Sequence, residues 1–92
     1  MPRVVVELPT MLAQVTGGRR RVDVEASTVR GALEAAFRAH PELRVHVLDE
    51  SGRLRPHVLC FHNEVNSRWR ESLDVPVSGG DRVTLLQAVS GG

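Results

Sequence analysis

One long helical pattern, with strand patterns on both sides of it, limits the possible folds of this chain more than any other feature. From Val29 onward, apolar residues recur every three or four positions, which predicts a helix with one buried stripe. Ser27 or Thr28 caps it, and Pro41 ends it because the residue before a proline disfavours helical backbone. The stripe consists of Val29, Ala32, Leu33, Ala36, Phe37 and His40.

The strand patterns form two groups. Residues 3–8 and 19–26 alternate apolar and polar side chains before the helix, and residues 57–62 and the segment from Val83 do so after it, with 66–69 as a short additional strand. This order predicts an α+β fold, with a mixed sheet of four to five strands and one main helix packed on one face. We expect the first and last strands to lie parallel in the centre.

Three connecting segments are less regular. Residues 10–15 are either a loop or one helical turn that tucks Met11, Leu12 and Val15 inward. Residues 42–49 are interpreted as a helical turn over the edge of the core. Core contacts from a loop are expected from Leu73, Val75 and Val77.

Length and composition exclude several classes of protein. Ninety-two residues predict a single domain, residues 1–92, with one thin core. No leader and no long apolar run is visible, so we expect a cytoplasmic protein with no membrane partner. A net charge of +1 and few aromatic residues argue against nucleic-acid binding. All 12 basic residues are arginine, so no lysine can accept an isopeptide bond.

The last segment begins as a strand and ends in two glycines. Residues 83–86 alternate as in a strand, and side-chain bulk then falls away through Ser90, Gly91 and Gly92. Glycine costs the most entropy to order, so a Gly-Gly end does not serve rigidity. Residues 87–92 are therefore either a frayed end or a narrow tail, reaching roughly 20 Å, whose carboxylate enters another protein's active site.

These features together resemble the ThiS/MoaD family of ubiquitin-like β-grasp sulfur carriers. The resemblance rests on the β-β-α-β-β order, the Gly79–Val83 turn into the last strand and the terminal Gly91-Gly92, and it covers essentially the whole chain. Three stretches are similar to the branch that carries sulfur for cysteine biosynthesis, namely residues 8–18, 51–58 and 83–92.

The resemblance implies a mechanism in which the carrier is the substrate of other enzymes and catalyses nothing. The Gly92 carboxylate would attack ATP in an adenylating enzyme, and a persulfide sulfur would then displace AMP to leave a thiocarboxylate. In the cysteine branch, a pyridoxal-phosphate enzyme would accept the sulfur, and a metalloprotease would then cleave after Gly92. The carrier itself would bind no cofactor, and the partner would bind the ATP, since the chain has no phosphate-binding glycine loop.

Other candidate sites have simpler interpretations. Cys60 and His62 share one face of a strand, but no third ligand stands at metal-site spacing, so Cys60 is interpreted as a buried small hydrophobe. The run Arg19–Arg21 is either a phosphate or RNA patch or, as we prefer, a solvated hairpin edge. The remaining histidines are interpreted as cap, loop and surface residues, in the order His40, His46 and His57.

Strand alternation also predicts an apolar patch beside the tail. If Val58 and Cys60 point into the core, the residues that alternate with them point out. The alternative is that the register slips and these outward residues belong to the core. Exposed apolar patches usually mark partner sites. The expected patch comprises Leu59, Phe61, Leu86, Ala88 and Val89.

Three functions remain open from the sequence. The first is a sulfur carrier. The second is the small subunit of an enzyme such as molybdopterin synthase, in which the tail stays inserted in one large partner. The third is a ubiquitin-like modifier or binding module, joined to other proteins through Gly92.

Overall fold

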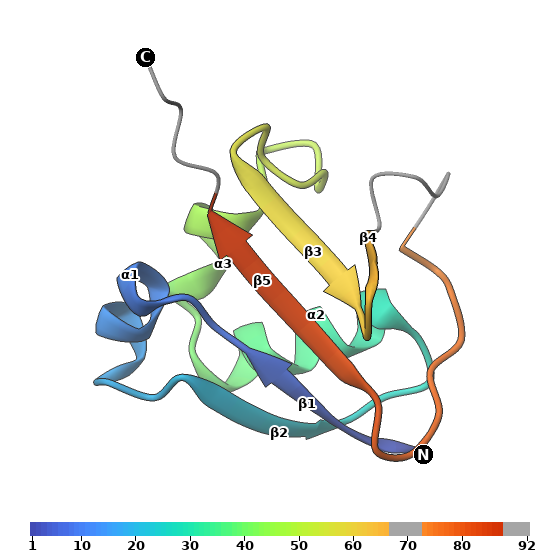
Figure 1. Cartoon of the computed structure of the whole chain (residues 1–92). Coiled ribbons are helices and arrows are strands. Elements are labelled where there is room, and N and C mark those ends of the chain that lie inside the picture. Colours follow the sequence, from blue (N-terminus) through green and yellow to red (C-terminus); the bar gives the residue numbers. More distant parts are fainter. Residues whose placement is uncertain (67–72, 88–92) are drawn as a thin grey trace.

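The chain builds a five-stranded mixed sheet with α2 packed against one face (Figure 1). The computed structural model describes residues 1–66 and 73–87. The strands are β1 (Arg3–Glu7), β2 (Arg21–Glu25), β3 (Val58–His62), β4 (Val65–Asn66) and β5 (Arg82–Gln87). The helices are α1 (Thr10–Ala13), α2 (Val29–Ala39) and α3 (Leu43–Val47), with a 3-10 turn at Gln14–Thr16.

The last strand lies in the middle of the sheet. The spatial order is β2-β1-β5-β3-β4, and β5 is parallel to β1 and antiparallel to β3. Both the α+β class and the central parallel pair were expected from the sequence and are confirmed. The structure therefore holds the strand that leads to residue 88 between two neighbours.

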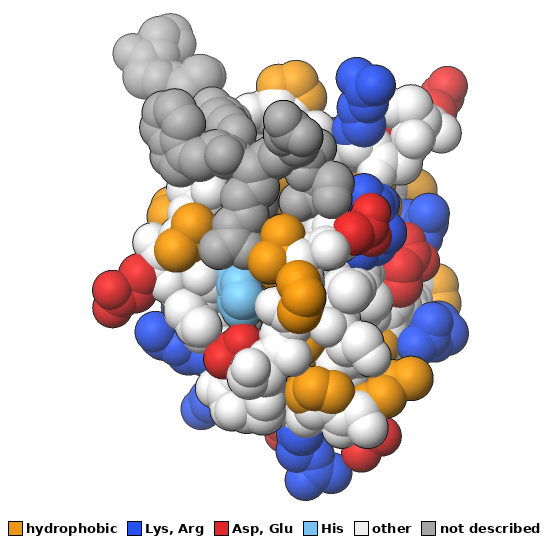
Figure 2. Space-filling view, turned by 90° about the vertical axis from the view of Figure 1, so that its right-hand side faces the viewer, with side chains coloured by type: hydrophobic (Ala, Val, Ile, Leu, Met, Phe, Trp, Pro, Cys, Tyr) orange, Lys and Arg blue, Asp and Glu red, His pale blue; other side chains and the backbone are white. Residues whose placement is uncertain are grey.

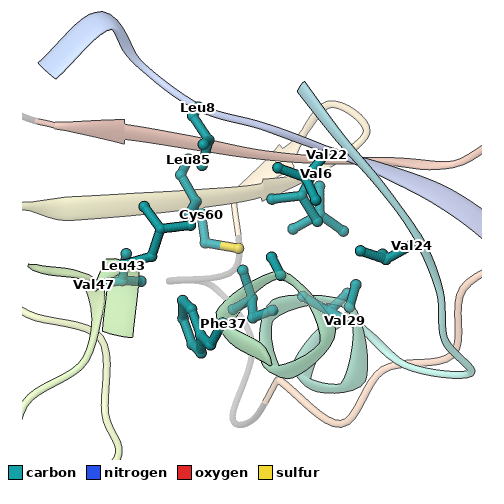
Figure 3. Close-up of a cluster of buried hydrophobic side chains, with 14 of the residues drawn as sticks. Val6, Leu8, Val22, Val24, Val29, Phe37, Leu43, Val47, Cys60 and Leu85 are labelled. Atoms are coloured by element: carbon teal, nitrogen blue, oxygen red, sulfur yellow. The ribbon is translucent and has the colours of Figure 1, made fainter. Parts of the chain in front are cut away.

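Alternation along the strands decides which face is buried. Val4 and Val6 of β1 lie under α2 with at most 2% exposure, whereas Val5 and Glu7 between and after them are half-buried on the opposite face. The same period of two fixes the inward face of β2, β3 and β5. Figure 3 shows Cys60 among the core side chains between the sheet and α2. The face of the sheet away from α2 is called the open face below.

The helix α2 begins and packs as its sequence predicts. Of the two candidate caps, Thr28 is the one used: its Oγ1 accepts a hydrogen bond from the Gly31 N–H at 3.0 Å. The apolar stripe is buried from Val29 to Phe37, whereas His40 is half-buried and forms the C-cap. Most of the stripe therefore faces the sheet.

Some local expectations need correction. Residues 10–13 form a helical turn that buries Leu12, but Met11 is 67% exposed and is not part of the core. The short fourth strand is Val65–Asn66, so only Asn66 of the expected 66–69 falls in it, and residues 67–69 lie outside the described residues.

Segments expected to touch the core do so. Residues 43–47 form α3, and Leu43 and Val47 are fully buried beside α2. Leu73 and Val77 are buried at the core edge, and Val75 packs against it while partly exposed.

Candidate functional site

The root of the C-terminal segment is the end of β5. Gln87 is the last described residue, and it pairs with Val58 of β3. The side-chain oxygen Oε1 of Gln87 is buried and accepts no hydrogen bond in the described part of the chain. The backbone pairing with Val58 therefore sets the position of Gln87. Five expected site residues follow it and lie outside the described residues, namely Ala88, Val89, Ser90, Gly91 and Gly92.

The described part of the expected apolar patch lies on the open face beside this root. Leu59 pairs with Leu86 across β3 and β5, so their side chains are neighbours. Leu86 is 42% exposed, and Leu59 and Phe61 are half-buried. These three residues are called the tail-root patch, and their placement agrees with the alternation of the two strands.

A polar pair lies next to this patch. Thr84 Oγ1 donates a hydrogen bond to Glu7 Oε1 at 2.8 Å, joining the parallel strands β5 and β1 through side chains as well as backbone. Thr84 also stands opposite Phe61 in the register of β3 and β5. The pair thus lies on the open face between the tail-root patch and the edge strand β2.

A carboxylate organises the turn that leads into β5. Asp81 Oδ2 accepts a hydrogen bond from the Ser78 N–H at 2.8 Å and lies 2.8 Å from His62 Nε2. The hydrogen bond from His62, together with those from Ser78 and Asn63, lowers the pKa of Asp81 from 3.8 to about 2. The group is therefore ionised at neutral pH and ties the turn to the end of β3.

The pair Cys60 and His62 has no metal-binding geometry. Cys60 is 1% exposed in the core, and His62 is engaged by Asp81 at the end of the same strand. Within the described residues, no group of three or more His, Cys, Asp or Glu side chains is arranged to hold a metal ion. The interpretation of Cys60 as a small core residue agrees with its burial.

The basic run and the other histidines lie at the surface. Arg19 and Arg20 are exposed in the turn before β2, and Arg21 is exposed on β2 itself, which is an edge strand. An exposed cation on an edge strand discourages pairing with another sheet, in line with the hairpin-edge interpretation. His46 and His57 are exposed as well.

The side of the molecule near β4 carries a mixed surface. Figure 2 shows hydrophobic, acidic and basic side chains interspersed there among polar ones. Such a mixture is ordinary on a folded domain and does not by itself indicate a binding site. None of the helices in the described ranges has the length and apolar character needed to cross a bilayer.

The described site combines the strand end at Gln87 with the tail-root patch and the pair Thr84–Glu7. The central strand fixes the root, and the tail-root patch places partly exposed apolar surface beside it. Sequence reasoning missed the pairs Thr84–Glu7 and His62–Asp81. The outward position of Thr84 was readable from strand alternation, whereas its partner was readable only once β1 and β5 had been placed in register.

Known proteins are similar to this chain over nearly its whole length. A family model described as the ThiS family matches residues 6–92. The sulfur carrier protein CysO of Mycobacterium tuberculosis is 30% identical over 91 residues, which cover 97% of this chain and 98% of that protein. Small archaeal modifier protein 1 of Haloferax volcanii is 37% identical over 83 residues, which cover 88% and 91% of the two chains.

A solved structure agrees with these similarities. A chain in the crystal structure of the BexX/CysO complex of Amycolatopsis orientalis superimposes with a TM-score of 0.86 at 29% identity. The superposition covers 97% of this chain and 99% of that chain.

Proposed function

The chain belongs to the ThiS family, and we propose that it is a sulfur carrier protein that bears its sulfur as a thiocarboxylate on Gly92. The observation that carries this proposal is the near full-length similarity to the CysO carrier, together with a family match that extends to Gly92. From the three stretches that are similar to the cysteine branch, residues 8–18, 51–58 and 83–92, we propose that the sulfur serves cysteine biosynthesis.

The proposed chemistry starts at the terminal carboxylate. A carboxylate oxygen attacks the α-phosphorus of ATP in an adenylating enzyme, pyrophosphate leaves, and an acyl adenylate forms. The outer sulfur of a persulfide then attacks the acyl carbon and AMP leaves, which gives an acyl persulfide. A second thiol attacks the inner sulfur of its S–S bond, forms a disulfide with it and releases the thiocarboxylate on Gly92. ATP is bound and consumed by the partner, and the carrier acts as its substrate.

The burial of the thiol supports the carboxylate as the sulfur-bearing group. Cys60 is the one cysteine in the sequence, and its side chain is 1% exposed beneath the sheet. A thiol reacts as the accessible thiolate, and burial in apolar surroundings disfavours that form. Loading sulfur on Cys60 would require the core to open, whereas the chain end needs no such opening.

The tail and the patch have separate roles in this proposal. Ser90 and Gly91 keep the end narrow, because a bulky or charged side chain there would clash or lose its hydration in a closed adenylation site. The tail-root patch, Leu59, Phe61 and Leu86, docks the body of the carrier, and Ala88 and Val89 would extend this contact. Docking and reaction are thus carried by different residues.

The sulfur-accepting partners follow from the cysteine branch. We propose that a pyridoxal-phosphate cysteine synthase takes the sulfur and that a metalloprotease removes the product after Gly92. The narrow tail would have to fit both active sites as well as the adenylating one.

A second candidate function is a protein modifier joined to other proteins through Gly92. The 37% identity to the Haloferax modifier favours it. The sequence contains no lysine, so this chain offers no ε-amino group on which a second copy could be attached. Conjugates formed through lysine would therefore carry a single copy at each site.

The intact mass of the protein purified from its native cell tests the proposal. We expect a species in which one sulfur replaces one oxygen, and we expect Cys60→Ala to carry it too. Loss of that species in a folded Cys60→Ala protein would contradict the proposal. Target proteins whose mass is raised by the mass of one carrier, without the sulfur-bearing species, would favour the modifier function instead.

A further inference from the structure

A groove runs along the open face between the ends of β1 and β5 and the start of β2. Its volume is about 410 Å³, and Leu86 of the tail-root patch forms part of its wall. Its lining also includes Glu7, Leu8, Pro9, Arg20 and Arg21. The groove therefore continues the patch toward the β2 edge.

The groove combines an apolar wall with two guanidinium groups. Pro9 is half-buried and Leu86 is exposed, so both offer apolar surface to a partner. Arg20 and Arg21 are exposed, and neither forms an ion pair with a carboxylate in residues 1–66 or 73–87. Glu7, the acidic residue of the groove lining, lies opposite Arg21 in the register of β1 and β2 and accepts the Thr84 hydroxyl through Oε1, so one carboxylate faces two guanidinium groups. Positive charge thus exceeds negative charge at this end of the open face.

The backbone beneath the two arginines is fixed before any partner arrives. The Leu8 N–H donates a hydrogen bond to the Arg20 carbonyl at 2.7 Å, which closes the connection between β1 and β2. Thr16 Oγ1 lies 2.7 Å from the Arg19 carbonyl oxygen and holds the preceding turn. Such preorganisation reduces the entropy lost when a partner binds.

We propose that this groove is a second docking point for the adenylating enzyme, occupied by a segment that carries a carboxylate side chain beside an apolar one. This inference rests on the proposed function. The guanidinium fork of arginine matches a carboxylate in a bidentate manner, and the wall of Pro9 and Leu86 takes the apolar neighbour. Charge complementarity of this kind mainly speeds encounter and fixes the register of the complex.

The position of the groove brings the same partner within reach. Leu86 lines the groove and precedes Gln87, and Gly92 is the fifth residue after Gln87. Five residues span at most about 17 Å when extended. An enzyme whose active site holds the Gly92 carboxylate therefore has surface close to the groove.

The test compares two variants with the same change in net charge. Arg20→Gln/Arg21→Gln removes two positive charges from the groove, and Arg38→Glu makes an equal change at an exposed position on α2, which packs on the opposite face of the sheet. In ATP–pyrophosphate exchange with the adenylating enzyme, we expect the groove variant to raise the KM for the carrier about tenfold at low salt. Its maximum rate should match that of the wild type.

Salt provides the second readout. Raising the ionic strength should increase the KM of the wild type and of Arg38→Glu. It should change the KM of the groove variant little, because that variant lacks the charges whose attraction to the partner is screened by salt. An unchanged KM in the groove variant, an equal rise in Arg38→Glu, or a fall in the maximum rate would each overturn the inference. Exchange by the wild type would still support the proposed function in those cases, whereas its absence would count against that function itself.

Discussion

His62 Nε2 and Asp81 Oδ2 lie 2.8 Å apart and join the end of β3 to the turn that starts β5. The same carboxylate oxygen accepts the Ser78 N–H, and Asn63 adds a reciprocal pair of bonds to Arg82 at 2.8 and 2.9 Å. These contacts fix where β5 begins. Because β5 is the central strand, they also help to fix where the tail leaves the sheet.

The ionisation of Asp81 predicts a specific acid sensitivity. Its folded pKa of about 2 lies below the ordinary 3.8, so the carboxylate stabilises the fold above pH 3.8 and loses this contribution as the pH falls toward 2. We expect the free energy of unfolding in urea to fall over this range and Asp81→Asn to fall less steeply. Asp23→Asn, at an exposed position of β2, is the control for the loss of one negative charge. Equal slopes for wild type and Asp81→Asn would contradict this account.

The cap of α2 gives a prediction with a neighbouring control. Thr28→Ala removes the hydrogen bond to the Gly31 N–H and should lower the free energy of unfolding by about 1 kcal/mol. Ser27→Ala, one residue earlier and exposed, should change it by less than about 0.5 kcal/mol. Urea unfolding of both variants measures the difference, and a larger loss in Ser27→Ala would show that the cap is misassigned.

The regular elements could be predicted because their periodicity is carried by many residues. The stripe from Val29 to Phe37 repeats over more than two turns, and alternation along residues 83–86 separates the buried Val83 and Leu85 from the exposed Leu86. A pattern carried by many residues still identifies the element when one residue departs from it. Met11 was misplaced because one helical turn contains too few residues to define a buried side.

The contacts between distant segments could not be predicted in the same way. The carboxylate of Glu34 on α2 binds Arg44 of α3, ten positions further along the chain, at 2.7 and 2.9 Å. Asp81 meets His62 from 19 positions away, and the groove gathers residues from three strand ends. Each depends on packing and register, which a single sequence does not display.

The tail-root patch predicts a docking defect that leaves the chemistry intact. Leu86→Glu places a charge against an apolar partner surface, so it should raise the carrier concentration needed for half-maximal ATP–pyrophosphate exchange. The rate should recover at saturating carrier because the chain end is unchanged. Val65→Glu is a matched control, since Val65 is 44% exposed and Leu86 is 42% exposed. A defect of the same size in both variants would show that the patch has no special role.

The most direct test of the central proposal, that the Gly92 carboxylate is the group adenylated, is ATP–pyrophosphate exchange with a carrier that lacks Gly92. Removing one residue moves the terminal carboxylate by more than about 3 Å from its place in line with the α-phosphate. We predict exchange with the wild-type carrier and none with the deletion variant, even at saturating concentration, while both unfold at the same urea midpoint. Exchange at the wild-type rate by the deletion variant would contradict the proposal.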